Sequence, residues 1–266
     1  LYMNKHAVLF GLNYSKDPNA KLRGCINDVI NTESILKEKG FNVERYTDDD
    51  NDPRKYATTG RGILSALDKL AWQTYVKKID FIWIHFSGHG TSIRDTSHDE
   101  RDGLDECFVP SDYKRVGVIS DDTFKKIFRK FNARTRIFCV FDCCHSGTIG
   151  DLRYRYLNSN VTMNRLNPVT ENYSAPCKAN IVVMSGCSDD QTSADAFNVQ
   201  RLGKFTGAMT SCLLTGIKKY KNLEIINIFD LLNDVRKLLR DKQFSQYPQL
   251  TSSFVFDFDK QFYFKL

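Results

Sequence analysis

Short apolar runs separated by polar turns recur along the chain, and they predict the strands of a sheet. Each run is roughly five to eight residues long, the usual length of a strand. The run at 137–141 is dense enough for a strand that is buried on both faces, as central parallel strands are. The predicted strands lie at residues 6–12, 41–46, 80–87, 137–141, 179–186 and 253–259.

Between these runs, apolar residues recur at the spacing of a helix face. The predicted helices lie at residues 25–39, 54–70, 205–218 and 223–240, and one more runs from Ser120 or Asp121 to about residue 131. Helices that alternate with strands are typical of a parallel sheet covered on both sides. We therefore expect an α/β fold, with a mostly parallel sheet flanked by helices on both faces.

Two polar segments are longer than the other connections. Residues 87–105 follow a buried strand, where loops usually carry function. Residues 148–178 are long for a connection within a compact domain, so we expect a mobile or processed linker there.

Composition and charge exclude several classes of protein. The net charge of +6 comes from 38 basic and 32 acidic residues, which are dispersed along the chain, so we expect no nucleic-acid partner. No apolar run approaches the roughly 18 residues of a membrane span, and no signal peptide is expected. Because the sequence begins without methionine, we expect it to be part of a longer chain.

The cysteines indicate free thiols. The chain has eight cysteines but no CxxC pair, and Cys143 is adjacent to Cys144. This pattern suits neither a zinc ribbon nor a disulfide framework. A reducing, cytoplasmic location is therefore expected.

Reactive side chains follow two of the predicted strands, in SGHG at 87–90 and DCCHSG at 142–147. The carboxyl ends of parallel strands meet at one edge of a sheet, where ligands of such folds bind. An imidazole can take the proton of a thiol, which then becomes a nucleophile, and the Gly90 amide can stabilise an oxyanion together with the Cys144 amide. The alternative is that His89 and Cys144 are an ordinary loop histidine and an inert core thiol.

Four other sites are suggested by short patterns, and each lacks a required residue. A dinucleotide turn would need glycine at Ile93, and an EF-hand would not accept Pro53 as its sixth residue. A phosphate loop would not have Phe205 after its lysine, and a cysteine phosphatase would need arginine at Gly150. Acyl transfer on peptides is therefore the favoured chemistry.

Four segments in order, RGCINDV, HFSGHG, DCCHSG and SGCSDDQTSAD, resemble those of the metacaspases, a family of caspase-fold cysteine peptidases. The resemblance covers nearly the whole chain. It implies one caspase-fold domain with a large-subunit-like region at 1–147, a linker at 148–178 and a small-subunit-like region at 179–266. The short spacing after DCCHSG is similar to type I members, which usually carry an amino-terminal extension.

The resemblance also implies roles for single residues. The family's nucleophile stands directly before HSG, which selects Cys144, and the general base falls on His89, with Gly90 as the oxyanion amide. Its pocket for Arg or Lys at the cleaved position maps onto Cys25, Asp28, Ser87 and Asp142. Carboxylates favour guanidinium and ammonium groups. Without the resemblance, Asp28 would be read as a charge near a helix amino terminus.

Calcium dependence is implied in the same way. The family's acidic site maps onto Asp105, Asp121, Asp122 and Asp151, and converging carboxylates would repel one another unless a hard cation joined them. The alternative is a helix cap for Asp121 and Asp122 and a solvated surface for Asp151. The resemblance gives no role to His85, a candidate core residue, or to His145.

The expected function is a calcium-dependent cysteine endopeptidase that cleaves after Arg or Lys, with protein or peptide substrates and self-cleavage in the linker. We expect a monomer without a membrane partner. Two alternatives remain: a non-catalytic scaffold on the same fold, and a paracaspase-like or legumain-like peptidase. A caspase that cleaves after Asp is not expected, because the QAC motif is absent.

Overall fold

The apolar runs of the sequence form the middle of one large sheet. The structure is a computed structural model that describes residues 3–94, 104–143, 152–156, 169–170, 177–186, 195–197, 205–220, 226–255 and 263–264. Within these residues the sheet has eight strands. Their spatial order is β2 (Asn42–Thr47), β1 (Lys5–Gly11), β3 (Phe81–Ser87), β7 (Arg136–Asp142), β10 (Asn180–Ser185), β14 (Gln249–Ser252), β8 (Tyr154–Tyr156) and β9 (Val169–Thr170).

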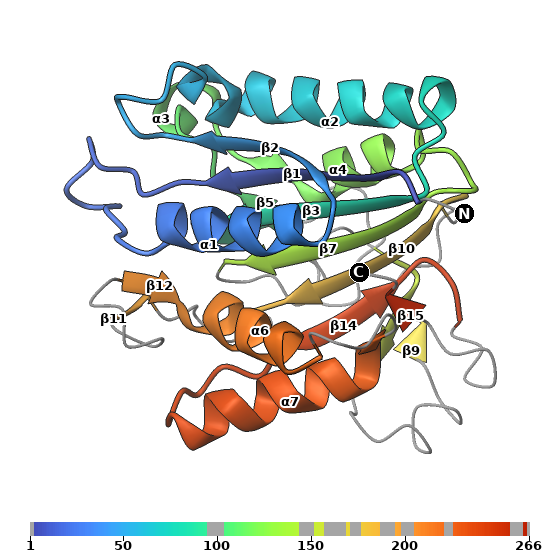
Figure 1. The fold of residues 1–266 in the computed structure, drawn as a ribbon. Helices are drawn as coiled ribbons and strands as arrows, with labels where there is room; N and C mark the ends of the chain where they lie inside the picture. Colours follow the sequence, from blue (N-terminus) through green and yellow to red (C-terminus); the bar gives the residue numbers. More distant parts are fainter. Residues whose placement is uncertain are drawn as a thin grey trace.

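Neighbouring strands from β2 to β10 are parallel, and β14, β8 and β9 continue the sheet with antiparallel pairing. The carboxyl ends of the parallel strands lie together at one edge, on the left in Figure 1. This arrangement confirms the expected fold class and brings the polar segments after β3 and β7 to the same edge.

Helices cover both faces of the sheet, as Figure 1 shows. One face carries α1 (Cys25–Glu38), α6 (Ala208–Lys219) and α7 (Ile228–Asp241), and the other carries α2 (Gly60–Val76) and α4 (Asp121–Phe128). Along β7, Phe138 and Val140 join the first core while Ile137, Cys139 and Phe141 join the second. Successive strand residues face opposite sides, which explains why the run is apolar without alternation.

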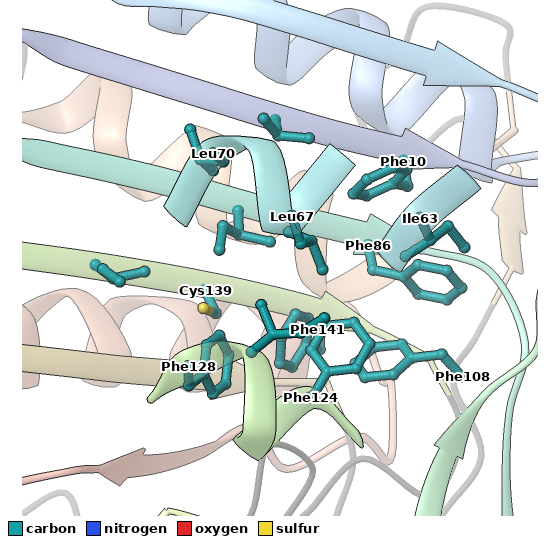
Figure 2. Close-up of a cluster of buried hydrophobic side chains, with 14 of the residues drawn as sticks. Phe10, Ile63, Leu67, Leu70, Phe86, Phe108, Phe124, Phe128, Cys139 and Phe141 are labelled. Carbon is teal, nitrogen blue, oxygen red and sulfur yellow. The ribbon is translucent and has the colours of Figure 1, made fainter. Parts of the chain in front are cut away.

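Phenylalanine rings dominate the core between α2, α4 and the sheet (Figure 2). The Phe108 ring lies 4.2 Å from Phe124, 4.7 Å from Phe86 and 4.8 Å from Phe141, measured between ring centroids. All four side chains are fully buried. Burying a side chain of this size stabilises a fold by about 1.5–3 kcal/mol. The cluster therefore fixes the ends of β3 and β7 against α4.

A small second sheet begins in the segment that was expected to be a loop, residues 87–105. It consists of β4 (Gly90–Arg94), β5 (Leu104–Phe108) and β6 (Ile119–Ser120), paired antiparallel. The expectation of a loop was wrong for β4. This edge strand is only half buried, so its sequence has no apolar pattern that would predict a strand. The other short elements are η1 (Lys55–Thr58), α3 (Tyr113–Val116), β11 (Asp195–Phe197), β12 (Phe205–Gly207), β13 (Ile226–Asn227) and β15 (Tyr263–Phe264).

Several predicted boundaries shift in the structure. The helix expected at 54–70 is divided into η1 and α2, and α2 begins after Thr59, whose hydroxyl accepts a hydrogen bond from the Gly62 amide at 3.1 Å. Similarly, α7 begins after Asn227, which caps the Phe229 amide at 2.9 Å. These caps were not recognised in the sequence.

The second half of the sheet also differs from the expected one. Its last long strand is β14, before the predicted strand at 253–259, which lies mostly outside the described residues. β14 has one strongly apolar residue, Leu250, so its sequence gives little strand signal. In the segment expected to be a linker, β8 pairs with β14, and β9 pairs with β8. None of the described helices has the length and apolar character of a membrane span.

Candidate active site

Two adjacent strands end side by side at the carboxyl edge of the sheet. Ser87 of β3 is paired directly with Asp142 of β7, and the Gly88 amide donates to the Asp142 carbonyl at 3.4 Å. In the sequence, His89 follows Ser87 by two residues and Cys144 follows Asp142 by two. Cys144, together with His145, lies outside the described residues. The strand register thus brings together the two strand ends that precede the predicted base and nucleophile in the sequence.

His89 is held by a backbone carbonyl. Its Nε2 atom lies 2.7 Å from the Ala20 oxygen. Because a carbonyl oxygen only accepts, Nε2 must carry a proton, and the neutral ring then has its lone pair on Nδ1. This tautomer leaves Nδ1 able to accept a proton, as a general base must.

Tyr14 supports His89 from the loop after β1. The Tyr14 hydroxyl accepts a hydrogen bond from the His89 amide at 2.9 Å and donates to the Val109 carbonyl at 2.7 Å. The two rings are stacked at a tilt, with centroids 4.9 Å apart. Burial raises the pKa of the Tyr14 hydroxyl well above its usual value, so the hydroxyl keeps its proton. Nothing in the sequence pattern singled out this residue.

The Gly90 amide is directed away from the β4–β5 ladder. The Val109 amide donates to the His89 carbonyl at 3.1 Å, so residues 89 and 109 face each other at a hydrogen-bonding position of the ladder. In an antiparallel ladder the next pair, Gly90 with Phe108, does not exchange hydrogen bonds. The N–H of Gly90 therefore points outward, as an oxyanion donor requires.

Two buried carboxylates lie next to the paired strand ends. The Ser87 hydroxyl donates to Asp28 Oδ2 at 2.6 Å, and the Gly207 amide donates to Asp28 Oδ1 at 2.7 Å. Asp142 Oδ2 accepts from both the amide and the hydroxyl of Thr210, at 2.9 and 2.8 Å. Three of the four predicted pocket residues thus form a close group, because Ser87 is hydrogen-bonded to Asp28 and is paired with Asp142 in the sheet.

The start of α1 completes this group. Cys25 is the first residue of α1 and is buried, and Asp28 lies in the same first turn. α1 approaches closely because Gly11, at the end of β1, has no side chain: a Cβ atom there would lie 2.5 Å from Val29 Cγ2 and 2.7 Å from the Cys25 oxygen. The fourth predicted pocket residue therefore also lies at this edge of the sheet.

His85 of β3 is fully buried between two threonines. Its Nδ1 lies 3.3 Å from Thr32 Oγ1 of α1, and its Nε2 lies 3.3 Å from Thr210 Oγ1 of α6. Burial lowers the pKa of His85 to about 3, so the ring is neutral at physiological pH. Sequence reasoning assigned no role to His85 and missed Thr210 and Gly207, which lie about 120 residues further along the chain.

Most thiols in the described part of the chain are unsuited to nucleophilic chemistry. Cys143, two residues after Phe141 in the sequence, is fully buried in the second core. Burial raises the pKa of Cys107 and of Cys212 to about 12, and it raises the pKa of Cys139 well above its usual value. Such thiols stay protonated and inert.

Three of the four residues predicted to bind calcium lie in the small sheet and in α4. Asp105 and Asp121 are buried, and Asp122 follows Asp121 in the first turn of α4. Asp121 Oδ2 accepts from the Glu106 amide at 3.0 Å, and its Oδ1 accepts from the Asp122 amide at 2.8 Å. No group of three or more His, Cys, Asp or Glu side chains suited to a metal ion forms within the described residues, and Asp151 lies outside them.

Comparison with known proteins identifies relatives over almost the whole chain. The model of the metacaspase, peptidase C14 domain matches residues 5–153. Metacaspase-5 of Trypanosoma brucei brucei is 33% identical over 96% of this chain, which spans 52% of that protein. Metacaspase-3 of the same organism is 32% identical, with 96% and 73% covered, and Metacaspase-1 of Mycosarcoma maydis is 32% identical, with 97% and 72% covered.

Solved structures agree with this result. Protein GSU0716 from Geobacter sulfurreducens superposes with a TM-score of 0.65 and 28% identity, covering 96% of both chains. Caspase-1 from Spodoptera frugiperda superposes with a TM-score of 0.60 over 94% of this chain and 88% of its own, at 13% identity, which supports the fold alone. The expected resemblance and caspase fold are confirmed, and the chain belongs to the metacaspases, a family of cysteine endopeptidases.

Proposed function

We propose that this metacaspase cleaves peptide bonds after Arg or Lys, with Cys144 as nucleophile and His89 as general base, in a calcium-dependent reaction. The pairing of Ser87 with Asp142 carries the proposal. It joins the strand ends that lead to His89 and Cys144, and it does so beside the buried carboxylates of Asp28 and Asp142. This arrangement supports a catalytic dyad and a site for a basic side chain at one edge of the sheet.

The reaction follows the acyl-transfer chemistry of thiol peptidases. His89 Nδ1 takes the proton of the Cys144 thiol, and the thiolate attacks the carbonyl carbon of the substrate. The carbonyl oxygen becomes an oxyanion, for which the outward N–H of Gly90 is a suitable donor. The C–N bond then breaks as His89 returns the proton to the leaving amine. Water, deprotonated by His89, hydrolyses the thioester and restores the thiol.

The Ala20 carbonyl supports this cycle in two ways. It fixes the ring orientation of His89, and it stabilises the imidazolium that forms when Nδ1 accepts the proton, since Nε2–H then donates to it more strongly. The Tyr14 hydroxyl fixes the backbone of His89 by accepting a hydrogen bond from its amide.

Selectivity for Arg or Lys is attributed to Asp28 and Asp142, with Ser87 and Cys25 beside them. Two carboxylates in a buried pocket attract a guanidinium or ammonium group and disfavour an acidic side chain. The hydrogen bonds from Ser87, Gly207 and Thr210 hold both carboxylates in fixed orientations before substrate binds. Little reorganisation is then required when the cation enters.

Calcium is assigned to Asp105, Asp121, Asp122 and Asp151. The donor set fits a hard cation in kind, because carboxylate oxygens are the ligands that Ca²⁺ prefers. Negative charge is concentrated here: besides burial, Asp121, Asp105 and Glu106 raise the pKa of the Cys107 thiol. When bound, the ion would neutralise this charge. Asp105 and Asp121 would then join β5 to α4. β5 in turn pairs with β4, the strand that begins at Gly90.

A cytoplasmic location and a monomeric state remain part of the proposal. The six described cysteines are free thiols, which suits a reducing compartment. Protein substrates follow from the family, and self-cleavage is proposed within residues 148–178.

Release of a dye from an Arg-ending peptide, with and without calcium, tests the proposed function. We expect activity that requires calcium and is lost by a factor on the order of 10⁴ or more in Cys144→Ala. The matched control is Cys143→Ala, which changes the neighbouring thiol and is expected to remain active. Full activity of Cys144→Ala would refute the assigned nucleophile, and calcium-independent activity would refute the assigned cofactor.

A further inference from the structure

The carboxylates of the pocket come from the first half of the chain, whereas their partners at α6 come from the second. The Gly207 amide binds Asp28, and Thr210 binds Asp142 through both its amide and its hydroxyl. Both partners lie beyond residues 5–153, the part matched by the family model. The amino terminus of α6 is therefore built around the pocket.

α6 lacks a capping side chain of its own. Gly207 is its N-cap residue, and Asp142 of β7 supplies the carboxylate that accepts the Thr210 amide in the first turn. The favourable dipole at this helix terminus acts on Asp142 in addition to the two hydrogen bonds. Asp142 thus anchors α6 and faces the pocket at the same time, so any shift of α6 moves this carboxylate.

The hydrogen bonds behind Asp142 have only one consistent direction. A carboxylate accepts, so the Thr210 hydroxyl uses its proton on Asp142 and can only accept from His85 Nε2–H. His85 Nδ1 is then the acceptor for the Thr32 hydroxyl. The chain of donors runs from Thr32 through His85 and Thr210 to Asp142, and it links α1, β3, α6 and β7.

Gly207 sets the space between the two carboxylates. A Cβ atom on this residue would lie 2.3 Å from Asp142 Oδ2 and 2.6 Å from Asp28 Oδ2, so even alanine would displace one of them. The backbone does not require glycine here, because φ is −64° and ψ is 135°, a conformation open to any residue. The absence of a side chain therefore serves the packing of the two carboxylates.

We propose that Thr210 and Gly207 are positioning residues that determine the selectivity of the pocket for a basic side chain. Thr210, supported by His85, orients Asp142, and Gly207 leaves room for Asp28 and Asp142 to face the same cation. This inference rests on the proposed function, because it assumes that these carboxylates bind the substrate.

The test compares Thr210→Val, which keeps the shape but removes the hydroxyl, with Thr210→Ser, which keeps the hydroxyl. The substrates are two peptides that end in Arg or in citrulline, a neutral analogue of Arg with nearly the same shape. For Thr210→Val we expect the KM of the Arg peptide to rise by roughly 10- to 100-fold, as for a lost hydrogen bond to a charged group, with kcat nearly unchanged. The preference for Arg over citrulline should fall by a similar factor, and Thr210→Ser should resemble the wild type.

Gly207→Ala provides a second variant. It should also lower the preference for Arg over citrulline, since one carboxylate is displaced. Thermal unfolding shows whether each variant is folded. An unchanged preference in folded Thr210→Val and Gly207→Ala would overturn the inference, as would Thr210→Ser behaving like Thr210→Val. A wild type without any preference for Arg would instead refute the proposed function itself.

Discussion

Ser87 and Asp142 are paired residue to residue where β3 and β7 end, and the Ser87 hydroxyl reaches on to Asp28 at 2.6 Å. This relationship connects the strand that leads to the proposed base, the strand that leads to the proposed nucleophile and the residues of the proposed acidic pocket. Under the proposed function, a substrate bound by its basic side chain would be held close to the ends of both strands, which is the condition for an efficient intramolecular attack.

The Tyr14 hydroxyl should be needed for the position of His89. Tyr14→Phe leaves the His89 amide and the Val109 carbonyl without their shared partner, so we expect kcat to fall by about 10-fold and the free energy of unfolding by about 1–3 kcal/mol. Tyr113→Phe is the matched control, because the Tyr113 hydroxyl donates to Asp17 instead. Steady-state kinetics of both variants test this expectation. A kcat of Tyr14→Phe equal to that of Tyr113→Phe would contradict a positioning role for Tyr14.

The buried His85 should make stability depend on pH. Its pKa is about 3 in the folded chain and about 6.5 when unfolded, so below pH 6.5 the unfolded chain binds a proton that the folded chain does not. Stability is therefore lost as the pH falls, and this group alone should lower the free energy of unfolding by about 2 kcal/mol between pH 7 and pH 5.

Urea unfolding of the wild type and of His85→Gln at both pH values measures this contribution. The variant is expected to lose about 2 kcal/mol less on acidification than the wild type. If the two proteins respond equally to pH, His85 is not the neutral, buried group described above.

The central fold could be predicted from the sequence because its signals are local. Dense apolar runs such as 80–87 and 137–141 are apolar on both faces of a strand. In a sheet that helices cover on both faces, such runs indicate central strands. The candidate reactive residues after these strands could be proposed for the same reason. β4 and β14 were not predicted, because an edge strand and a short antiparallel strand bury too few apolar residues to produce a pattern.

The partners of the predicted site could not be found in this way. Tyr14, Thr210 and Gly207 act through contacts with residues 68 to 179 positions away, which no local pattern encodes. The predicted start of α6 at residue 205 was three residues early because its cap, Asp142, comes from another strand. Three-dimensional structure was needed to identify them.

The phenylalanine cluster should be a main source of stability. Phe108 contacts three other rings and is fully buried, so Phe108→Ala is expected to lower the free energy of unfolding by about 3–5 kcal/mol. The control Tyr75→Ala removes a ring of α2 that is 57% exposed and should change stability by less than about 0.5 kcal/mol. Denaturant unfolding compares the two, and a loss below about 1 kcal/mol for Phe108→Ala would contradict the described packing.

Self-cleavage should avoid the strand β8. Arg155 is paired with Thr251 in the sheet, whereas Lys178 is exposed and precedes β10. A peptidase needs an accessible, extended chain, so we expect a cut after Lys178, or after Arg165, which lies outside the described residues. Mass spectrometry after calcium addition identifies the cut, with Cys144→Ala as the control that stays whole. A cut after Arg153 or Arg155 would show that β8 leaves the sheet before cleavage.

The most direct test of the account is the ratio of kcat/KM for two peptides that differ only in Arg or citrulline at the cleaved position. The buried carboxylates of Asp28 and Asp142 predict that the Arg peptide is cleaved at least about 100-fold more efficiently, as expected when a buried charge loses its partner. Asp142→Asn should reduce this ratio strongly. Equal cleavage of the two peptides by the wild type would contradict the proposed acidic pocket.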